Sequence, residues 1–425
     1  TMSNPTVWNI LAILDRWVRA SKDRKLLSQT ENANAIRRGL TEYNPCPIEA
    51  LFQDDKPKGN IIFSGSDYQM RSRAIVRAAE LANSNGKIVI IFHVNNSYLE
   101  QELIRNLGLS RLTIINENNP YYDPFVGLTN LEISSMILES APSGMPIPPA
   151  GRHYLDGILN FIRLQNVRPS VLHLLNCNHF RLIDKVNDAV QKNSLLPLAG
   201  NKIISQLMQG DPARSSIENY FIQFGYQASK VVARNTITGI NFTSLANSGC
   251  VIVFDIISCS NNILLNLLFA EVKRLTSLSY QLFVVIDSIP FSSSEMMQQF
   301  EANSGTDYQI FLSADDAYSS FRSPEDRFFS FVGRSSQILI SKHISNYSAQ
   351  KWSDVIGSYD KEETSKTLSS GTSFLGGYFT GGSTSISISQ KRENIVKPET
   401  ILQMGINEVY FRDVSLQGVG HTYLH

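Results

Sequence analysis

The sequence predicts an α/β fold, in which a mainly parallel central sheet is flanked by helices and interrupted by an all-α insertion. Two observations carry this prediction. Short segments that are apolar at every position recur along the chain and alternate with amphipathic stretches, as expected of strands buried on both faces of a sheet. Between about residues 127 and 235 these segments disappear, and apolar residues follow the spacing of helices instead.

Seven apolar segments are predicted to be the strands of the core. They cover residues 60–63, 87–92, 111–115, 250–255, 281–287, 308–312 and 338–340. Helices are predicted in the all-α region over residues 131–138, 154–164, 170–175, 181–191 and 215–232. The serine-rich segment 383–389 alternates in polarity, which suits an edge strand or an ordered loop.

The changes of pattern divide the chain into four parts. Residues 1–58 are predicted to be an N-terminal helical segment and a linker, because apolar residues at helical spacing give way to prolines. Residues 59–126 are expected to form the first part of the α/β core, and residues 127–235 the all-α domain. Residues 236–425 supply the second part of the core with a C-terminal strand and tail.

The composition is that of a folded protein with more than one structural unit. The chain has 425 residues, of which 42% are hydrophobic and 18% charged, so a disordered or collagen-like chain is excluded. Lys and Arg together number 38, as do Asp and Glu, and the formal net charge is zero. Any contact with DNA must therefore come from a local patch or from several subunits together.

Membrane and metal signals are weak in the sequence. No stretch reaches the roughly 18 apolar residues of a membrane span, and the first residues lack the features of a signal peptide. We expect a cytoplasmic chain, with the inner face of the membrane as its location if upstream segments or partners anchor it. The cysteines form no CxxC pair, so no metal site and no disulfide framework are expected; they are Cys46, Cys177, Cys250 and Cys259.

The turn after the first core strand has the position of a phosphate-binding loop, whose full pattern is GxxxxGK[ST]. Here the stretch 65–72 reads GSDYQMRS. Gly65 and Ser72 keep the first glycine and the hydroxyl that would bind Mg²⁺. Arg71 stands in place of the lysine, and Met70 in place of the second glycine.

These replacements alter what the loop can bind. The planar fork of Arg71 cannot reproduce a compact ammonium group. Met70 occupies a position that often needs close backbone approach, which a side chain hinders. Asp67 adds negative charge where a triphosphate would lie. A strand, turn and helix without any phosphate remain an equally good interpretation.

The segment 281–287 resembles the strand that completes a nucleotide site. It ends in Asp287, which could hold the Mg²⁺ shell, but Ser288 follows where a glutamate would activate water. A serine hydroxyl has no basicity near neutral pH, so the general base is missing here. The alternative is that Asp287 only forms hydrogen bonds at the end of a strand.

The order of these parts resembles the type IV secretion and conjugation coupling proteins, the TraG/TraD-like members of the FtsK–HerA class of hexameric DNA-pumping ATPases. The resemblance covers roughly residues 58–415. It rests on segments 58–63, 86–92, 107–108, 112–115, 122–125, 250–257, 283–290, 310–321, 385–390, 392 and 398–402. It implies a RecA-like P-loop NTPase core with an all-α domain inserted at the place found here.

The resemblance also assigns vestigial site residues. They are Gly65, Arg71 and Ser72 in Walker A, Asp287 and Ser288 in Walker B, and Asp315 and Asp316 at the position of a sensor glutamine. His93 replaces an acidic residue that often follows the second strand. Since several chemical positions are altered together, we expect no catalytic residue and no cofactor, with ATP and Mg²⁺ bound only if the site is retained.

We interpret the chain as a pseudo-ATPase of the coupling-protein type, a structural or adaptor component of a conjugative or type IV secretion assembly. Its expected partners are proteins of that assembly, among them an active ATPase paralogue; contact with DNA and formation of an oligomer stay open.

Two alternatives remain. The first is an active hexameric DNA-translocating ATPase. In it Arg71 would bind the phosphates, Ser72 and Asp287 would hold Mg²⁺, and a nearby acid would replace the missing base. The candidate acids are Asp315, Asp316 and Glu295. The second is a nucleotide-binding regulator of an active paralogue, for which an arginine would reach a neighbouring subunit's γ-phosphate. The candidates are Arg322, Arg327 and Arg334.

Overall fold

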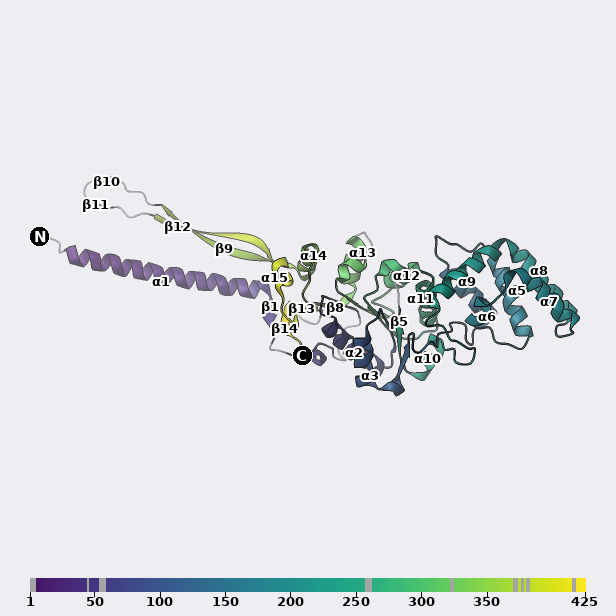
Figure 1. The fold of residues 1–425 in the computed structure, drawn as a ribbon. Coiled ribbons are helices and arrows are strands. Elements are labelled where there is room, and N and C mark those ends of the chain that lie inside the picture. The colour runs from purple at the N-terminus through teal and green to yellow at the C-terminus, as the bar shows by residue number, and fades with distance from the viewer. Residues whose placement is uncertain are drawn as a thin grey trace. The chain divides into compact units, whose positions relative to one another are not determined.

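A computed structural model describes residues 5–43, 46–52, 59–256, 262–321, 325–369, 374–375, 378–379, 383–414 and 418–425 (Figure 1). Cys259, Arg322 and most of the expected linker lie outside these residues. The chain forms two compact units. One comprises Thr1–Pro45 and Lys342–Tyr423, and the other comprises Cys46–Ser341 and Leu424–His425. The division into four parts expected from the sequence stays a prediction.

The larger unit is built on seven parallel strands in the order β8-β2-β7-β6-β3-β5-β4. The strands are β2 (Asn60–Ser64), β3 (Ile88–His93), β4 (Leu112–Ile115), β5 (Val251–Asp255), β6 (Leu282–Asp287), β7 (Gln309–Ala314) and β8 (Ser335–Ile340). Each overlaps a predicted segment, and the predicted fold class is confirmed. Because the strands are parallel, their carboxyl ends meet along one edge, where ligands of such sheets usually bind.

Helices cover this sheet on both faces, which explains why its strands are apolar throughout. Every residue of β2, β3 and β6 is buried. The helices that follow core strands are α2 (Tyr68–Ser84), α3 (Ser97–Leu107), α11 (Asn262–Ser277), α12 (Glu295–Ala302) and α13 (Glu325–Gly333), with α10 (Phe242–Ser248) preceding β5. Phe92 is in ring contact with Phe242, Phe254 and Phe269, at centroid distances of 5.1 to 6.3 Å. These contacts join β3 to α10, to α11 and to the neighbouring strand β5.

The all-α region lies within the same unit, and its helices gather together in Figure 1. They are α4 (Asn130–Ser140), α5 (Gly151–Leu164), α6 (Val171–Leu175), α7 (Leu182–Gln191), α8 (Pro197–Gly210) and α9 (Arg214–Ala228). The sequence did not predict α8, whose first residue is a proline. Gly210 lets α8 end against α5, because a Cβ there would lie 2.3 Å from the backbone nitrogen of Tyr154.

The all-α region joins the sheet through a buried polar junction. Tyr122 forms isolated parallel bridges with Val232 and Ile240, on the far side of the helices in sequence. Asp123 Oδ1 accepts hydrogen bonds from the backbone nitrogens of Phe125 and Val171, each at 3.1 Å. Burial raises the pKa of Asp123, and these two bonds counteract the increase.

The smaller unit combines a long helix with strands near the C-terminus. Helix α1 (Pro5–Arg38) packs against β9 (Ser358–Ser369), and the side-chain amide of Asn34 donates to the carbonyl of Glu362 at 2.8 Å. Strand β9 pairs antiparallel with β12 (Ser383–Asn394) along their full lengths. The predicted edge strand or loop at 383–389 is thus one arm of a two-stranded ribbon.

The remaining elements of this unit are β1 (Leu40–Glu42), α14 (Asn346–Ile356), β10 (Phe374–Leu375), β11 (Tyr378–Phe379), α15 (Pro398–Gln403), β13 (Glu408–Asp413) and β14 (Val419–Tyr423). Strand β14 pairs parallel with β1 and antiparallel with β13. Short 3-10 helices in the larger unit are η1 (Ile48–Leu51), η2 (Leu109–Arg111), η3 (His179–Arg181), η4 (Asp211–Ala213), η5 (Phe291–Ser293) and η6 (Ala317–Ser320). Among the described residues, no helix has both the length and the apolar character needed to cross a bilayer.

Candidate functional site

Three backbone nitrogens of the turn between β2 and α2 and of the first helical turn donate hydrogen bonds within the chain. Helix α2 begins three residues after Gly65, and Asp67 caps it by accepting a hydrogen bond from Met70 N at 3.0 Å. Arg71 N donates to the carbonyl of Asp67 at 3.1 Å, while Gly65 N donates to the carbonyl of Ala314, also at 3.1 Å. A phosphate-binding loop turns such amides toward its ligand. Here these three are engaged within the chain.

Met70 fills the space that the second glycine would leave open. Its side chain is fully buried, whereas Tyr68 is about half exposed and makes an edge-on contact with Tyr98, with ring centroids 6.0 Å apart. The start of α2 therefore packs as an ordinary amphipathic helix, with Met70 turned into the core.

Arg71 is buried, with 2% of its surface exposed, and points back under the turn. Its Nε donates to Ser313 Oγ at 3.1 Å, and its Nη2 to Ser288 Oγ at 3.5 Å. Nη1 donates to the carbonyl of Gly65 and to Asp315 Oδ1, the latter at 2.7 Å. All three guanidinium nitrogens are thus bound to side chains or backbone from the ends of β2, β6 and β7.

Asp287 faces Arg71 from the end of β6 and is equally buried. Its Oδ1 lies 3.9 Å from Nη2 of Arg71 and accepts a hydrogen bond from Ser313 Oγ at 2.7 Å. Its Oδ2 accepts from the side-chain amide of Asn96 at 2.8 Å, and the same amide donates to Ser72 Oγ at 3.1 Å. The two groups expected to share Mg²⁺, Ser72 and Asp287, are therefore bridged by an amide.

The two sensor-like aspartates have different roles. Asp315 forms the ion pair with Arg71, although its side chain is 77% exposed. Asp316 caps η6 by accepting from Tyr318 N at 3.2 Å. Glu295, considered as a substitute base, bonds the backbone nitrogen and hydroxyl of Ser143.

The structure therefore gathers Gly65, Arg71, Ser72, Asp287, Ser288 and Asp315 at one edge of the sheet and places Asp316 in a cap. Sequence reasoning missed Asn96 and Ser313. Asn96 precedes a helix and accepts from Leu99 N at 3.1 Å, so its capping position was a usable signal. Ser313 is an inner residue of a strand, where nothing in the sequence distinguishes it.

The arginines considered for a neighbouring subunit are held within the chain where they are described. Arg334 Nη2 lies 2.7 Å from Glu301 Oε1, and its Nη1 donates to three backbone carbonyls. Arg327 Nη1 donates to Gln298 Oε1 at 2.8 Å.

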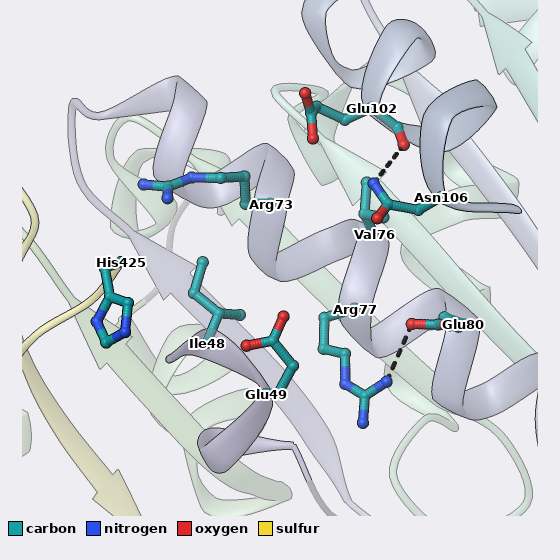
Figure 2. Close-up of a pocket in the computed structure, with 9 residues that line it drawn as sticks. All are labelled: Ile48, Glu49, Arg73, Val76, Arg77, Glu80, Glu102, Asn106 and His425. Carbon is teal, nitrogen blue, oxygen red and sulfur yellow. Dashed lines mark hydrogen bonds and ion pairs between the residues drawn. The ribbon is translucent and has the colours of Figure 1, made fainter. Parts of the chain in front are cut away.

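A separate pocket lies on another face of α2, between η1 and α3 (Figure 2). Its walls carry both signs of charge. Arg77 pairs with Glu80 at 3.0 Å, and the side chain of Asn106 donates to the carbonyl of Glu102 at 2.7 Å. The other lining residues are Ile48, Glu49, Arg73, Val76 and His425. The pocket includes none of the residues around Arg71.

Gly65 is the residue of the turn least able to accept a side chain. It has a φ of +151°, and a Cβ built on it would lie 1.8 Å from Ser341 Oγ and 2.9 Å from Ser341 Cβ. We expect Gly65→Ala to lower the free energy of unfolding by about 2–3 kcal/mol, through overpacking and backbone strain. Urea denaturation measures this effect.

Gly86→Ala is the matched control, because Gly86 has a φ of +74° but no atom within 4 Å of the added Cβ. Gly86→Ala should lower the free energy of unfolding by only about 1 kcal/mol, the cost of holding alanine at a positive φ. Equal losses in the two variants would mean that the turn does not pack against Ser341 as described.

No protein-family model and no curated protein matches this sequence. Solved structures do match. The unbound monoclinic form of the bacterial conjugative coupling protein TrwBdeltaN70 is similar over 89% of this chain and 90% of its own, with 12% identity and a TM-score of 0.53. The plasmid coupling protein TrwB in complex with the non-hydrolysable GTP analogue GDPNP is similar over 89% of this chain and 91% of its own, with 11% identity and a TM-score of 0.54. TrwB in complex with ADP and Mg²⁺ is also similar over 89% of this chain and 91% of its own, with 12% identity and a TM-score of 0.51. These similarities establish the fold.

Proposed function

We propose that this chain, which has the fold of the conjugative coupling protein TrwB, is a component of a conjugation or type IV secretion assembly and does not hydrolyse ATP there. It would act as a structural or adaptor subunit, in contact with other proteins of the assembly and with an active ATPase paralogue. The fold similarity, which extends over 89% of the chain, supports the assembly. The burial and the hydrogen bonds of Arg71 support the loss of hydrolysis.

The loss of hydrolysis is inferred from one observation: Arg71 is buried and bound to other residues of the protein. A residue that binds phosphates must present its charge to the ligand, yet Arg71 is 2% exposed and all its nitrogens have protein partners. Binding a nucleotide would break these bonds and leave Asp287 buried without a cation, which is costly.

The local charges also oppose a nucleotide. The guanidinium of Arg71 faces the carboxylates of Asp287 and Asp315, and Asp67 adds a third acid at the start of α2. One cation among three acids offers no net attraction to a triphosphate. The amide of Asn96 bridges Ser72 and Asp287, so a metal ion would have to displace it. These residues do not fit a Mg²⁺-nucleotide.

The proposal predicts that the purified chain neither turns over nor binds Mg²⁺-ATP. Phosphate release should stay at the level of the blank with single-stranded or double-stranded DNA present. Thermal unfolding should be unaffected by Mg²⁺-ATP, whereas a ligand at 100 times its dissociation constant would add about 2.7 kcal/mol of stability. Any residual phosphate release should be the same in Arg71→Ala, which identifies it as contamination.

Two outcomes would contradict this proposal. Turnover at the rate of a motor ATPase, stimulated by DNA and abolished in an Arg71→Ala variant that circular dichroism shows to be folded, would favour a DNA-translocating enzyme. A nucleotide-dependent thermal shift without turnover, lost in the same variant, would instead favour a nucleotide-binding regulator.

A further inference from the structure

A histidine and two carboxylates converge beside the site described above. His93 ends β3, Asp255 ends the neighbouring strand β5, and Glu100 lies in the first turns of α3. His93 and Asp255 are paired in register across the two strands. One potential ligand atom from each of the three residues lies within 4.8 Å of the other two. The parallel register brings Asp255 to His93, and the helix that follows β3 adds Glu100.

The imidazole of His93 is fully buried, and one of its nitrogens lacks a hydrogen bond to any described residue. This nitrogen, Nε2, lies 3.4 Å from Glu100 Oε1 without forming a hydrogen bond. Nδ1 accepts from the backbone nitrogen of Asn96 at 3.2 Å and lies 3.7 Å from Asp255 Oδ1. A buried polar nitrogen without a partner is costly, so its retention between two carboxylates calls for a ligand.

The carboxylates are partly solvent-accessible, with the side chains of Glu100 and Asp255 18% and 15% exposed. Both oxygens of Glu100 accept hydrogen bonds from the side-chain amide of Asn116, at 3.2 and 3.3 Å. Asp255 Oδ1 accepts from the backbone nitrogen of Asn95 at 2.8 Å. No lysine or arginine in the described part of the chain pairs with either carboxylate. The cluster therefore places two carboxylates beside the imidazole, without a cationic side chain from the described residues.

We propose that His93, Glu100 and Asp255 bind a divalent transition-metal ion, with Zn²⁺ preferred and Mn²⁺ accepted. One imidazole nitrogen and two carboxylates form a mixed nitrogen and oxygen ligand set, which suits these ions better than Mg²⁺ or Ca²⁺. Bonds of about 2.1 Å place the ligands of a tetrahedral ion about 3.4 Å apart. The distance between His93 Nε2 and Glu100 Oε1 already has this value. The ligand atom of Asp255 lies within 4.8 Å of those of the other two residues, so a small movement of its side chain would complete the site.

Ligation through Nε2 has a definite proton balance. In the neutral ring, a bond accepted by Nδ1 from Asn96 N requires the proton to be on Nε2. Ligation through Nε2 moves this proton to Nδ1, and the 3.2 Å bond from Asn96 N is given up. Asp255 then serves as a ligand of the ion and not as the acceptor of the Nδ1 proton, because the two ring nitrogens point in different directions.

The experiment measures metal binding by the full chain after treatment with a chelator and dialysis. Isothermal titration calorimetry with Zn²⁺ should give one ion per chain, and Mn²⁺ should bind with an altered electron paramagnetic resonance spectrum. Glu100→Gln and Asp255→Asn, which keep the shape of each side chain, should weaken Zn²⁺ binding by about 100-fold or more. His93→Gln should abolish binding, and circular dichroism reports whether each variant is folded.

Glu102→Gln is the matched control, since Glu102 is a partly buried carboxylate of the same helix outside the cluster. It should bind Zn²⁺ as the wild type does. The inference is overturned if the wild-type chain binds no Zn²⁺, or if Glu100→Gln and Glu102→Gln bind equally well. Binding that is lost in Asp287→Asn but kept in Glu100→Gln would place the ion at the other cluster and would overturn it as well.

Discussion

Replacing Arg71 with alanine is expected to lower the free energy of unfolding by about 3–5 kcal/mol. The guanidinium is the cation next to the buried carboxylate of Asp287, and both side chains are 2% exposed. Removing it leaves that charge without compensation and also removes hydrogen bonds to Ser313 and Ser288. Equilibrium denaturation in urea, without nucleotide, measures the loss.

The same helix supplies the control. Arg77 lies on α2 and pairs with Glu80 at a partly exposed position, so Arg77→Ala should cost about 0.5 kcal/mol or less. Arg71→Lys should recover little of the loss, because an ammonium group cannot reach the several acceptors that the planar fork contacts. A loss in Arg71→Ala no larger than in Arg77→Ala would show that the cation is not needed by the fold. That outcome would point back to a role with phosphates.

Glu271 should make the stability fall as the pH rises. It is buried on α11, and burial raises its pKa to about 8, against a usual value of 4.5, despite hydrogen bonds from Phe242 N and the Tyr122 hydroxyl. Between these two pH values the folded protein keeps a proton that the unfolded chain has lost. The contribution of Glu271 is therefore complete below pH 4.5 and disappears as the pH rises through 8, by about 3–5 kcal/mol.

Glu271→Gln tests this directly, because glutamine keeps the acceptor oxygen and cannot ionise. As the pH rises from about 5 to about 8.5, the wild type should lose stability that the variant keeps, so the variant becomes progressively more stable relative to the wild type. Urea denaturation at each pH measures this difference in unfolding free energy. Glu139→Gln, an exposed carboxylate near Lys273 at 4.0 Å, should keep the wild-type dependence. A constant difference across the pH range would mean that Glu271 does not titrate as described.

This effect concerns the junction between the sheet and the all-α region. Glu271 accepts a hydrogen bond at 3.1 Å from Tyr122, whose backbone bridges the two ends of that region. Ionisation of Glu271 would place a charge under this junction, so we expect the helices to loosen there first at high pH.

The sequence by itself determined the sheet. Strands that are apolar at each position, such as 251–254 and 282–286, are possible only where both faces are covered, and a helix must then join each parallel neighbour. It also showed that Arg71, Met70 and Ser288 replace the residues of a nucleotide site. The sequence could not say what these replacements do instead.

Only the tertiary structure decided the use of each polar group. Arg71 meets Ser313 and Asp315 more than 240 residues away along the chain, because β2 and β7 are neighbours and their carboxyl ends coincide. Asn96 meets Asp287, and His93 lies opposite Asp255, because strands that are distant in sequence are neighbours in the sheet. Local patterns encode burial and periodicity, whereas hydrogen bonds and ion pairs depend on which strand ends come together. That adjacency exists only in the folded sheet.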